Sequence, residues 1–288
     1  MSGMGLVAIK RRIKSITNTT KITRAMGLVS TSKYKKIKGL VDTNNNYVKK
    51  LEETVKQVKI NYEEDNIYLS GNNNITKLYI VLTSDAGLCG GFNWTVVNKM
   101  LISVKGSEES NSMDYNVIIV GQKGRSLLKK HNIQTVAEYV ETSDIPIQKE
   151  ATTIMNRALS MYISGQVGEV HIVYKKLVSA LKNEVIVEKL LPLNLDNEHN
   201  SNKEYVDIQA VDETAMQEII SLYLSGKMLN SMLHSKASEH RARMESMGSA
   251  TTNANDMLDK LNLSYNRIRQ SEITQAISEI VGGAEAQK

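Results

Sequence analysis

The chain has 288 residues, of which 41% are hydrophobic, and its 36 Lys and Arg against 31 Asp and Glu give a net charge of +5. This length accommodates one large domain or two modest ones. The single cysteine, Cys89, excludes an internal disulfide framework, and the five histidines form no HExxH or other metal-ligand pattern. No apolar run approaches the ~20 residues that span a bilayer. An N-terminus that is charged and amphipathic from the start is unlike a signal peptide. We therefore expect a soluble protein of a reducing compartment without a metal site.

The positive charge is concentrated at the N-terminus. Residues 1–41 carry ten Lys and Arg and no acid, and Asp42 is the first acidic residue. Such a block indicates an acidic partner, either nucleic acid or an acidic protein surface. A solvated helix face is the alternative, but a helix without compensating acids repels itself. The sequence favours an acidic partner.

The first predicted helix runs from about Met4 to Val58, contains no proline and repeats at spacings of three and four. This spacing is typical of a coiled-coil seam. The middle of the seam is small and polar, so it buries little apolar area, and we expect it to need external support. The predicted seam consists of Ile9, Ile13, Ile16, Thr20, Thr23, Gly27, Ser30, Tyr34, Ile37, Val41, Val48, Leu51, Val55 and Val58.

The middle of the chain changes period after a polar stretch at residues 61–76. Short apolar runs there alternate with amphipathic segments, which predicts a doubly wound α/β domain with a mainly parallel sheet. The last two strands have the spacing of a hairpin. The predicted strands are 78–82, 117–120, 135–139, 169–174 and 184–189, and the predicted helices are 93–104, a short one ending at 131, and 148–164.

The C-terminal segment 212–282 is a second proline-free run with a coiled-coil period. A straight helix of that length would measure on the order of 100 Å at 1.5 Å per residue, so it must have a partner helix and protrude. Its predicted seam is Ile219, Leu222, Gly226, Leu229, Leu233, Lys236, His240, Met244, Met247, Thr251, Ala254, Leu258, Leu261, Tyr265 and Ile268. The predicted fold is α/β: a long antiparallel coiled coil of the terminal helices (1–60 and 208–288) with an inserted Rossmann-like doubly wound domain (76–206).

Two glycine-bearing loops are candidate phosphate sites. TSDAGLCGGFN (83–93) follows a strand, but its glycines lack the GxGxxG spacing and no GK[ST] follows. A tight turn that needs positive φ is the favoured interpretation, and GQKGR (121–125) is a weaker candidate still. Cys89 has no base motif beside it, and no pair of acids stands out. We predict no catalytic, cofactor or metal site. A nucleotide-dependent enzyme using the 83–93 loop and a basic nucleic-acid binder stay as alternatives, although the latter lacks interleaved aromatic residues.

Three stretches resemble a known family in sequence and in order. They are IKRRIKSITNTTKITRAMGLVSTSKYKK (9–36), TSDAGLCGGFN (83–93) and ASEHRARMESMGSATTNANDMLDKLNLSYNRIRQSEITQAISEIVGGA (237–284). Together they resemble the gamma subunit of F-type ATP synthases over almost the whole chain. The family loop usually reads TSDRGLCGGFN, so Ala86 replaces an arginine.

This resemblance implies a central rotor shaft with no catalytic site of its own. It would couple rotation of the membrane c-subunit ring, driven by protons or sodium, to conformational cycling of the catalytic beta subunits during ATP synthesis or hydrolysis. The implied partners are the alpha and beta subunits (one copy per three of each), the epsilon subunit and the c-ring, with no nucleic acid and no cofactor. Membrane association would be indirect, as a peripheral protein at the cytoplasmic face of a bacterial plasma membrane.

The resemblance also implies particular contacts. Met26 and Arg243 are expected to be near neighbours beside an acidic lever of the beta subunit, so paired residue numbers would total about 269. The last twenty or so residues would then lack a partner helix. Polar contacts with a catalytic-subunit loop are implied for Arg269, Gln270 and Thr274. From charge, we expect Lys10, Arg11, Arg12, Lys21 and Arg24 to bear on acidic surfaces of the ring. The apolar tip residues Ile273, Ile277, Ile280 and Val281 predict a surrounding apolar collar.

Overall fold

The computed structural model describes residues 5–60, 66–105, 115–179, 182–194 and 213–285. The chain divides into two compact units, which we describe separately: residues 1–30 with 243–288, and residues 31–242. The helices are α1 (Leu6–Ile60), α2 (Ile67–Ser70), α3 (Phe92–Lys105), α4 (Gln122–Lys130), α5 (Gln148–Ile163) and α6 (Glu213–Glu285). The strands are β1 (Lys77–Leu82), β2 (Tyr115–Val120), β3 (Ala137–Tyr139), β4 (Glu169–Leu177) and β5 (Asn183–Leu191).

Helix α1 buries the face that its sequence period predicts. Every residue of its predicted seam is buried or half-buried, and the small polar residues Thr20, Thr23 and Ser30 are among the buried ones. The two threonine hydroxyls have backbone hydrogen-bond partners within α1. Thr20 Oγ1 lies 3.0 Å from the Ile16 carbonyl oxygen, and Thr23 Oγ1 lies 3.1 Å from the Thr20 carbonyl oxygen. Backbone acceptors in the preceding turn thus make a polar seam tolerable.

Helix α6 departs from its predicted seam at one position. Leu222 is 48% exposed, whereas its neighbours Tyr223 and Leu224 are buried. In the second unit α6 contributes residues to the core of the sheet as well as facing α1, so its buried surface is wider than a coiled-coil stripe. The face that joins the sheet core is made of Met216, Ile220, Leu224, Met228 and Met232. Leu222 lies on neither buried face.

The register of the helix pair is antiparallel but differs from the predicted one. In the first unit Thr23 contacts Thr251, and a Cβ placed on Gly27 would contact Met247, so paired numbers total 274. In the second unit a Cβ placed on Gly226 would contact Leu51, Tyr47 and Val48, which give totals between 273 and 277. The predicted total of 269 is therefore wrong by five residues, which places Met26 and Arg243 out of opposition. A seam that repeats every three or four residues leaves several offsets with similar apolar pairing.

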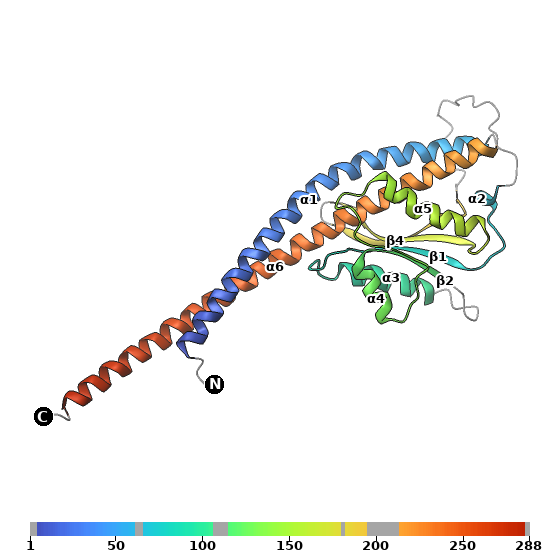
Figure 1. Ribbon diagram of the computed structural model, residues 1–288. Helices are drawn as coiled ribbons and strands as arrows, with labels where there is room; N and C mark the ends of the chain where they lie inside the picture. The colour runs from blue at the N-terminus through green and yellow to red at the C-terminus, as the bar shows by residue number, and fades with distance from the viewer. Residues whose placement is uncertain (1–4, 61–65, 106–114, 180–181, 195–212, 286–288) are drawn as a thin grey trace. The chain divides into compact units, whose positions relative to one another are not determined.

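The sheet has the order β3-β2-β1-β4-β5, in which β1, β2, β3 and β4 are parallel and β5 returns antiparallel to β4. The chain steps outward from β1 to β3 through α3 and α4, and then crosses back to β4 through α5. Right-handed crossovers require that reversal to place α5 on the opposite face, and Figure 1 shows α3 and α4 on one side and α5 on the other. The doubly wound prediction and the β4–β5 hairpin are confirmed.

Alternate residues of the central strands enter two different cores. Tyr79 and Val81 pack with Val96, Val97 and Met100 of α3. Their neighbours Leu78, Ile80 and Leu82 enter a larger cluster with α5, α1 and α6, which includes Ala158, Val55 and Met228. Within residues 31–242 the two long helices are therefore part of the core of the α/β domain.

The short helix α2 is the element that the sequence did not predict. Asn66 caps it by accepting the Tyr68 amide at 2.9 Å, a local arrangement hidden in an asparagine-rich stretch. The predicted loop at 105–114 lies outside the described residues apart from Lys105, which ends α3. The other helices and strands begin and end within three residues of the predicted bounds.

Candidate functional site

The 83–93 loop is closed by its own side chains. The Ser84 amide donates to Asn93 Oδ1 at 2.8 Å, and Asn93 Nδ2 donates back to Ser84 Oγ at 2.8 Å. Cys89 is buried beside them, with its sulfur 3.4 Å from Asn93 Nδ2. Of the three glycines only Gly90 has a positive φ, 57°, and Leu88 shares that conformation with a φ of 62°. The predicted tight turn is present, but one of its two positive-φ positions is occupied by a leucine, which adopts this conformation less readily than glycine.

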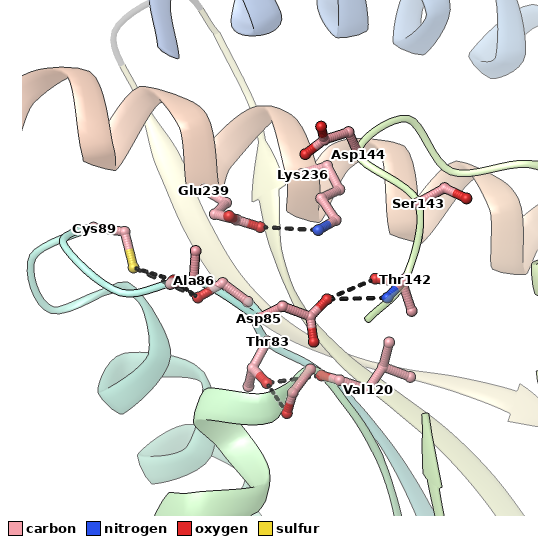
Figure 2. A network of polar contacts seen from close by, with 12 residues as sticks. Thr83, Asp85, Ala86, Cys89, Val120, Thr142, Ser143, Asp144, Lys236 and Glu239 are labelled. Atoms are coloured by element: carbon pink, nitrogen blue, oxygen red, sulfur yellow. Dashed lines mark hydrogen bonds and ion pairs between the residues drawn. The ribbon is translucent and has the colours of Figure 1, made fainter. Parts of the chain in front are cut away.

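An internal carboxylate occupies the N-terminus of α4, where GQKGR was a candidate anion site. Asp85 Oδ1 accepts the Gln122 amide at 3.0 Å, and the same side chain accepts three further hydrogen bonds from Glu141 and Thr142 at 3.0–3.1 Å. Figure 2 shows Asp85 pointing toward Thr142. Because amides at a helix N-terminus are the groups that hold a phosphate, Asp85 takes the place of an external anion here.

Helix α6 fills the crevice where doubly wound proteins bind ligands. That crevice lies at the carboxyl ends of the strands where the strand order reverses, which is between β1 and β4 in this sheet. The cavity there has a volume of about 10 Å³ and is lined by Leu82, Thr83, Val120, Thr142, Met232, Ser235 and Lys236. Ligand pockets usually measure ~300 Å³ or more. The crevice has no room for a nucleotide, which removes the main support for the enzyme alternative.

A polar group joins α1 to α6 in the second unit, and its α6 members Asn230 and His234 are buried whereas Asn45 of α1 is exposed. Asn45 Oδ1 accepts hydrogen bonds from Asn230 Nδ2 at 2.9 Å and from His234 Nε2 at 3.0 Å. Burial lowers the pKa of His234 to about 4, and the nearby Lys176 acts in the same direction. The ring is therefore neutral near pH 7. This group was not identified from the sequence, because the buried surface of α6 carries many other polar side chains, including Ser231, Ser235 and Ser238.

Two ion pairs lie where the loop after β3 meets the long helices. Lys33 Nζ lies 2.8 Å from Asp144 Oδ2, and this hydrogen bond holds the pKa of Asp144 below its usual range. On α6, Lys236 Nζ lies 3.4 Å from Oε2 of the buried Glu239 (Figure 2). The sequence placed Lys33 in the basic block and Lys236 in the predicted seam of the C-terminal helix, and neither was assigned an internal partner. Lys33 thus pairs with a carboxylate of its own chain.

The five cations predicted to face a partner lie exposed along α1. They make no ion pair with any residue in the described ranges. Met26 is half-buried, and Arg243 is only 6% exposed, so most of the Arg243 side chain is covered by the chain itself. The exposed cations are Lys10, Arg11, Arg12, Lys21 and Arg24.

The C-terminal end of α6 has the exposure of a helix without a partner. Residues 269–284 are exposed throughout, including Arg269, Gln270 and Thr274. Thr274 Oγ1 donates to the Gln270 carbonyl at 2.9 Å, within the helix itself. The tip residues Ile273, Ile277, Ile280 and Val281 are 51–72% exposed. The first three recur at spacings of four and three, so they share one face, and an exposed apolar stripe of this kind marks an interaction site.

A helix pair with an exposed basic face, an open apolar tip and a filled ligand crevice defines a protein that works through contacts with other proteins. A family model described as ATP synthase matches residues 5–287. The chain belongs to the ATP synthase gamma-chain family. It is 48% identical over 289 residues to the ATP synthase gamma chain of Clostridium novyi (strain NT), and 47% identical to that of Clostridium botulinum (strain Langeland / NCTC 10281 / Type F), with complete coverage of both chains in each case.

Solved structures share the fold. A chain of the Tetrahymena thermophila mitochondrial ATP synthase central stalk/c-ring structure aligns with a TM-score of 0.58 at 23% identity, covering 80% of this chain and 99% of that one. A chain of the Euglena gracilis mitochondrial ATP synthase rotor aligns with a TM-score of 0.67 at 14% identity, covering 93% and 98%. Among the described residues, no helix has the length and apolar character to cross a membrane.

Proposed function

We propose that the chain is the central rotor shaft of an F-type ATP synthase. It couples ion-driven rotation of the membrane c-ring to conformational cycling of the catalytic beta subunits, and it has no catalytic site of its own. The observation that carries this proposal is the exposure of α6 at residues 269–284, a helix end that carries both apolar and polar side chains, in a member of the gamma-chain family.

We assign the shaft and the foot of the rotor to the segments that the sequence predicted. Residues 1–60 and 208–288 form the shaft, and residues 76–206 form the foot. A shaft can favour different conformations in three identical catalytic sites only if its contacts differ around its axis. The apolar stripe of Ile273, Ile277 and Ile280 supplies such a difference, since it occupies one side of α6.

The proposed partners are the alpha and beta subunits, with one copy of this chain per three of each, together with the epsilon subunit and the c-ring. Support comes from the related structures, which are of a central stalk/c-ring and an OSCP/F1/c-ring assembly of mitochondrial ATP synthases. Because the similar gamma chains described above are from Clostridium, we place the complex at the cytoplasmic face of a bacterial plasma membrane, with this chain attached peripherally through the c-ring to an ion-transporting complex.

The proposed contacts with the catalytic ring fall into four groups. Met26 and Arg243 lie beside the acidic lever of the beta subunit, and Arg269, Gln270 and Thr274 contact a catalytic-subunit loop. The tip formed by Ile273, Ile277, Ile280 and Val281 sits in an apolar collar. The exposed α1 cations Lys10, Arg11, Arg12, Lys21 and Arg24 bear on acidic surfaces of the ring.

Native mass spectrometry of this chain mixed with alpha and beta subunits from the same source tests the proposal, with ATP hydrolysis assayed in parallel. We expect one copy per three alpha and three beta subunits, and a gain of ATP turnover on assembly. If no complex forms with folded alpha and beta subunits, the shaft proposal is wrong.

A further inference from the structure

The β3–α5 loop (residues 140–147) is a direct link between the sheet and both long helices. Ile145 packs against a small apolar cluster to which α1 contributes Ile37 and Val41, and α6 contributes Leu233 and Ala237. One residue earlier, Asp144 accepts the hydrogen bond from Lys33 of α1. The loop therefore touches the helix pair through one apolar and one charged side chain.

Two carboxylates from different elements hold this loop in shape. Asp85, in the loop after β1, accepts the amides of Glu141 and Thr142 at 3.0 and 3.1 Å and the Thr142 hydroxyl at 3.0 Å. Glu150, in α5, accepts the amide and hydroxyl of Ser143 at 2.9 and 2.8 Å. The first of these loop residues, Glu141, has a φ of 57°. Figure 2 shows Asp85 and Thr142 facing each other below Lys236 of α6.

The sheet has a second, different attachment to the same helices. The large apolar cluster joins it to α1 through Val48, Val55 and Val58. On α1 the nearest members of the two clusters, Val41 and Val48, are roughly 10 Å apart at 1.5 Å per residue, whereas on α6 the clusters meet at Met232 and Leu233. Apolar packing is not directional, so the large cluster alone resists separation better than it resists twisting. Hydrogen bonds to a carboxylate are directional and strong, and a second attachment some distance away opposes rotation about the first.

We propose that Asp85 and Glu150 are positioning residues that hold the β3–α5 loop as a torsional brace between the sheet and the paired helices. This inference rests on the proposed rotor function, because a brace against twisting matters only when torque passes between the sheet and the helices. The brace is assigned wholly within residues 31–242, which form one compact unit. Asp85 acts through the loop and contacts no reacting group.

The test measures twist in the assembled motor. A bead is attached to the α/β domain of the alpha–beta–gamma complex, and the width of its angular distribution is recorded while ATP-driven rotation is paused. We expect Asp85→Asn and Glu150→Gln to assemble with the same stoichiometry and to widen this distribution. A residue that supports only folding would lower assembly or thermal stability and leave the width in assembled complexes unchanged.

The matched control is Glu138→Gln. It breaks a neighbouring ion pair, Arg125 Nε–Glu138 Oε2 at 2.6 Å, that does not involve the β3–α5 loop or the long helices, and the width should stay that of the wild type. Where a carboxylate variant does not assemble, Ile145→Ala tests the same brace at its contact with the helices. An unchanged width in the assembled variants would overturn the inference. A wild-type complex that does not rotate would instead contradict the proposed function.

Discussion

The hydroxyl groups of Thr23 and Thr251 lie 2.7 Å apart across the antiparallel helix pair. Thr251 Oγ1 also lies 2.8 Å from the Met247 carbonyl, and Thr23 Oγ1 lies 3.1 Å from the Thr20 carbonyl. A hydroxyl has a single proton, so one threonine donates to the backbone while the other donates across the pair. The two hydroxyls meet only when Thr23 and Thr251 are opposite each other, and the contact therefore favours the observed register.

Replacing both of these threonines by valine should destabilise the chain by less than the sum of the two single replacements. Thr23→Val or Thr251→Val leaves the other hydroxyl without its cross-helix partner, and we expect the free energy of unfolding to fall by about 1 kcal/mol. The double variant should lose less than the sum of the single losses. Urea unfolding of the four proteins measures this coupling, with Thr19→Val, an exposed hydroxyl bonded within its own helix, as the control. Additive losses would contradict the assignment.

Two glycines should respond to alanine with opposite signs. A Cβ on Gly168 would fall on the carbonyl oxygen of Asn74, which is backbone and cannot rotate away. We expect Gly168→Ala to lower the free energy of unfolding by about 1–3 kcal/mol. Gly248 lies inside α6 with nothing within 4 Å of a built Cβ, so Gly248→Ala should raise it by up to about 1 kcal/mol. Urea unfolding compares the two, and equal effects would contradict the packing at Gly168.

The buried His234 should make the chain less stable in mild acid. Its pKa is about 4 in the folded chain and about 6.5 when unfolded, so between these values the unfolded state binds more protons. The penalty is absent above pH 6.5, grows as the pH falls, and is complete near pH 4, where it reaches at most about 3 kcal/mol.

Urea unfolding between pH 4 and 8 measures this dependence, and His234→Gln should flatten the curve below pH 6.5. His131→Gln, at an exposed ring stacked on Trp94, is the control for loss of a histidine as such. The same acid slope in His234→Gln and in the wild type would show that another group is responsible.

The polar end of α6 should matter for turnover and not for folding. Arg269 and Gln270 are exposed, so replacing both with alanine should leave the unfolding free energy of the isolated chain within about 0.5 kcal/mol of the wild type. We expect slower ATP hydrolysis by the assembled head. The comparison is with Lys260→Ala, an exposed residue nearer the paired part of α6. Unchanged assembly and turnover in the double variant would rule out the proposed contact.

The apolar tip should be required for assembly with the ring. Ile277 and Ile280 are 56% and 72% exposed, so exchanging both for lysine removes no internal packing and should leave the circular dichroism of the chain unchanged. Inside an apolar collar each lysine would have to lose its hydration without a partner. We therefore expect weaker binding to the alpha and beta subunits in native mass spectrometry. Val7→Lys, at another exposed apolar residue, is the control, and equal binding by both variants would argue against a collar.

Much of this protein was predictable from its sequence, for a local reason. The absence of proline and the three-and-four spacing predict both long helices, and short apolar runs between turns predict the strands, because helix and strand periods depend on neighbouring residues. The buried seam of α1 follows the predicted residues from Ile9 to Val58. The open end of α6 was also foreseen, since its length exceeds that of α1.

Only the tertiary structure decided the contacts between segments that are distant along the chain. The register of the helix pair depends on particular cross-helix pairs such as Thr23 with Thr251, because a repeating seam permits several offsets. Leu222 is exposed because α6 packs its neighbouring face, which includes Ile220 and Leu224, against the sheet. Asp85 lies in a loop that the sequence predicted to be a tight turn, and its four hydrogen bonds join it to residues 37–57 positions away. Sequence period describes one element at a time, whereas these contacts depend on where two elements meet.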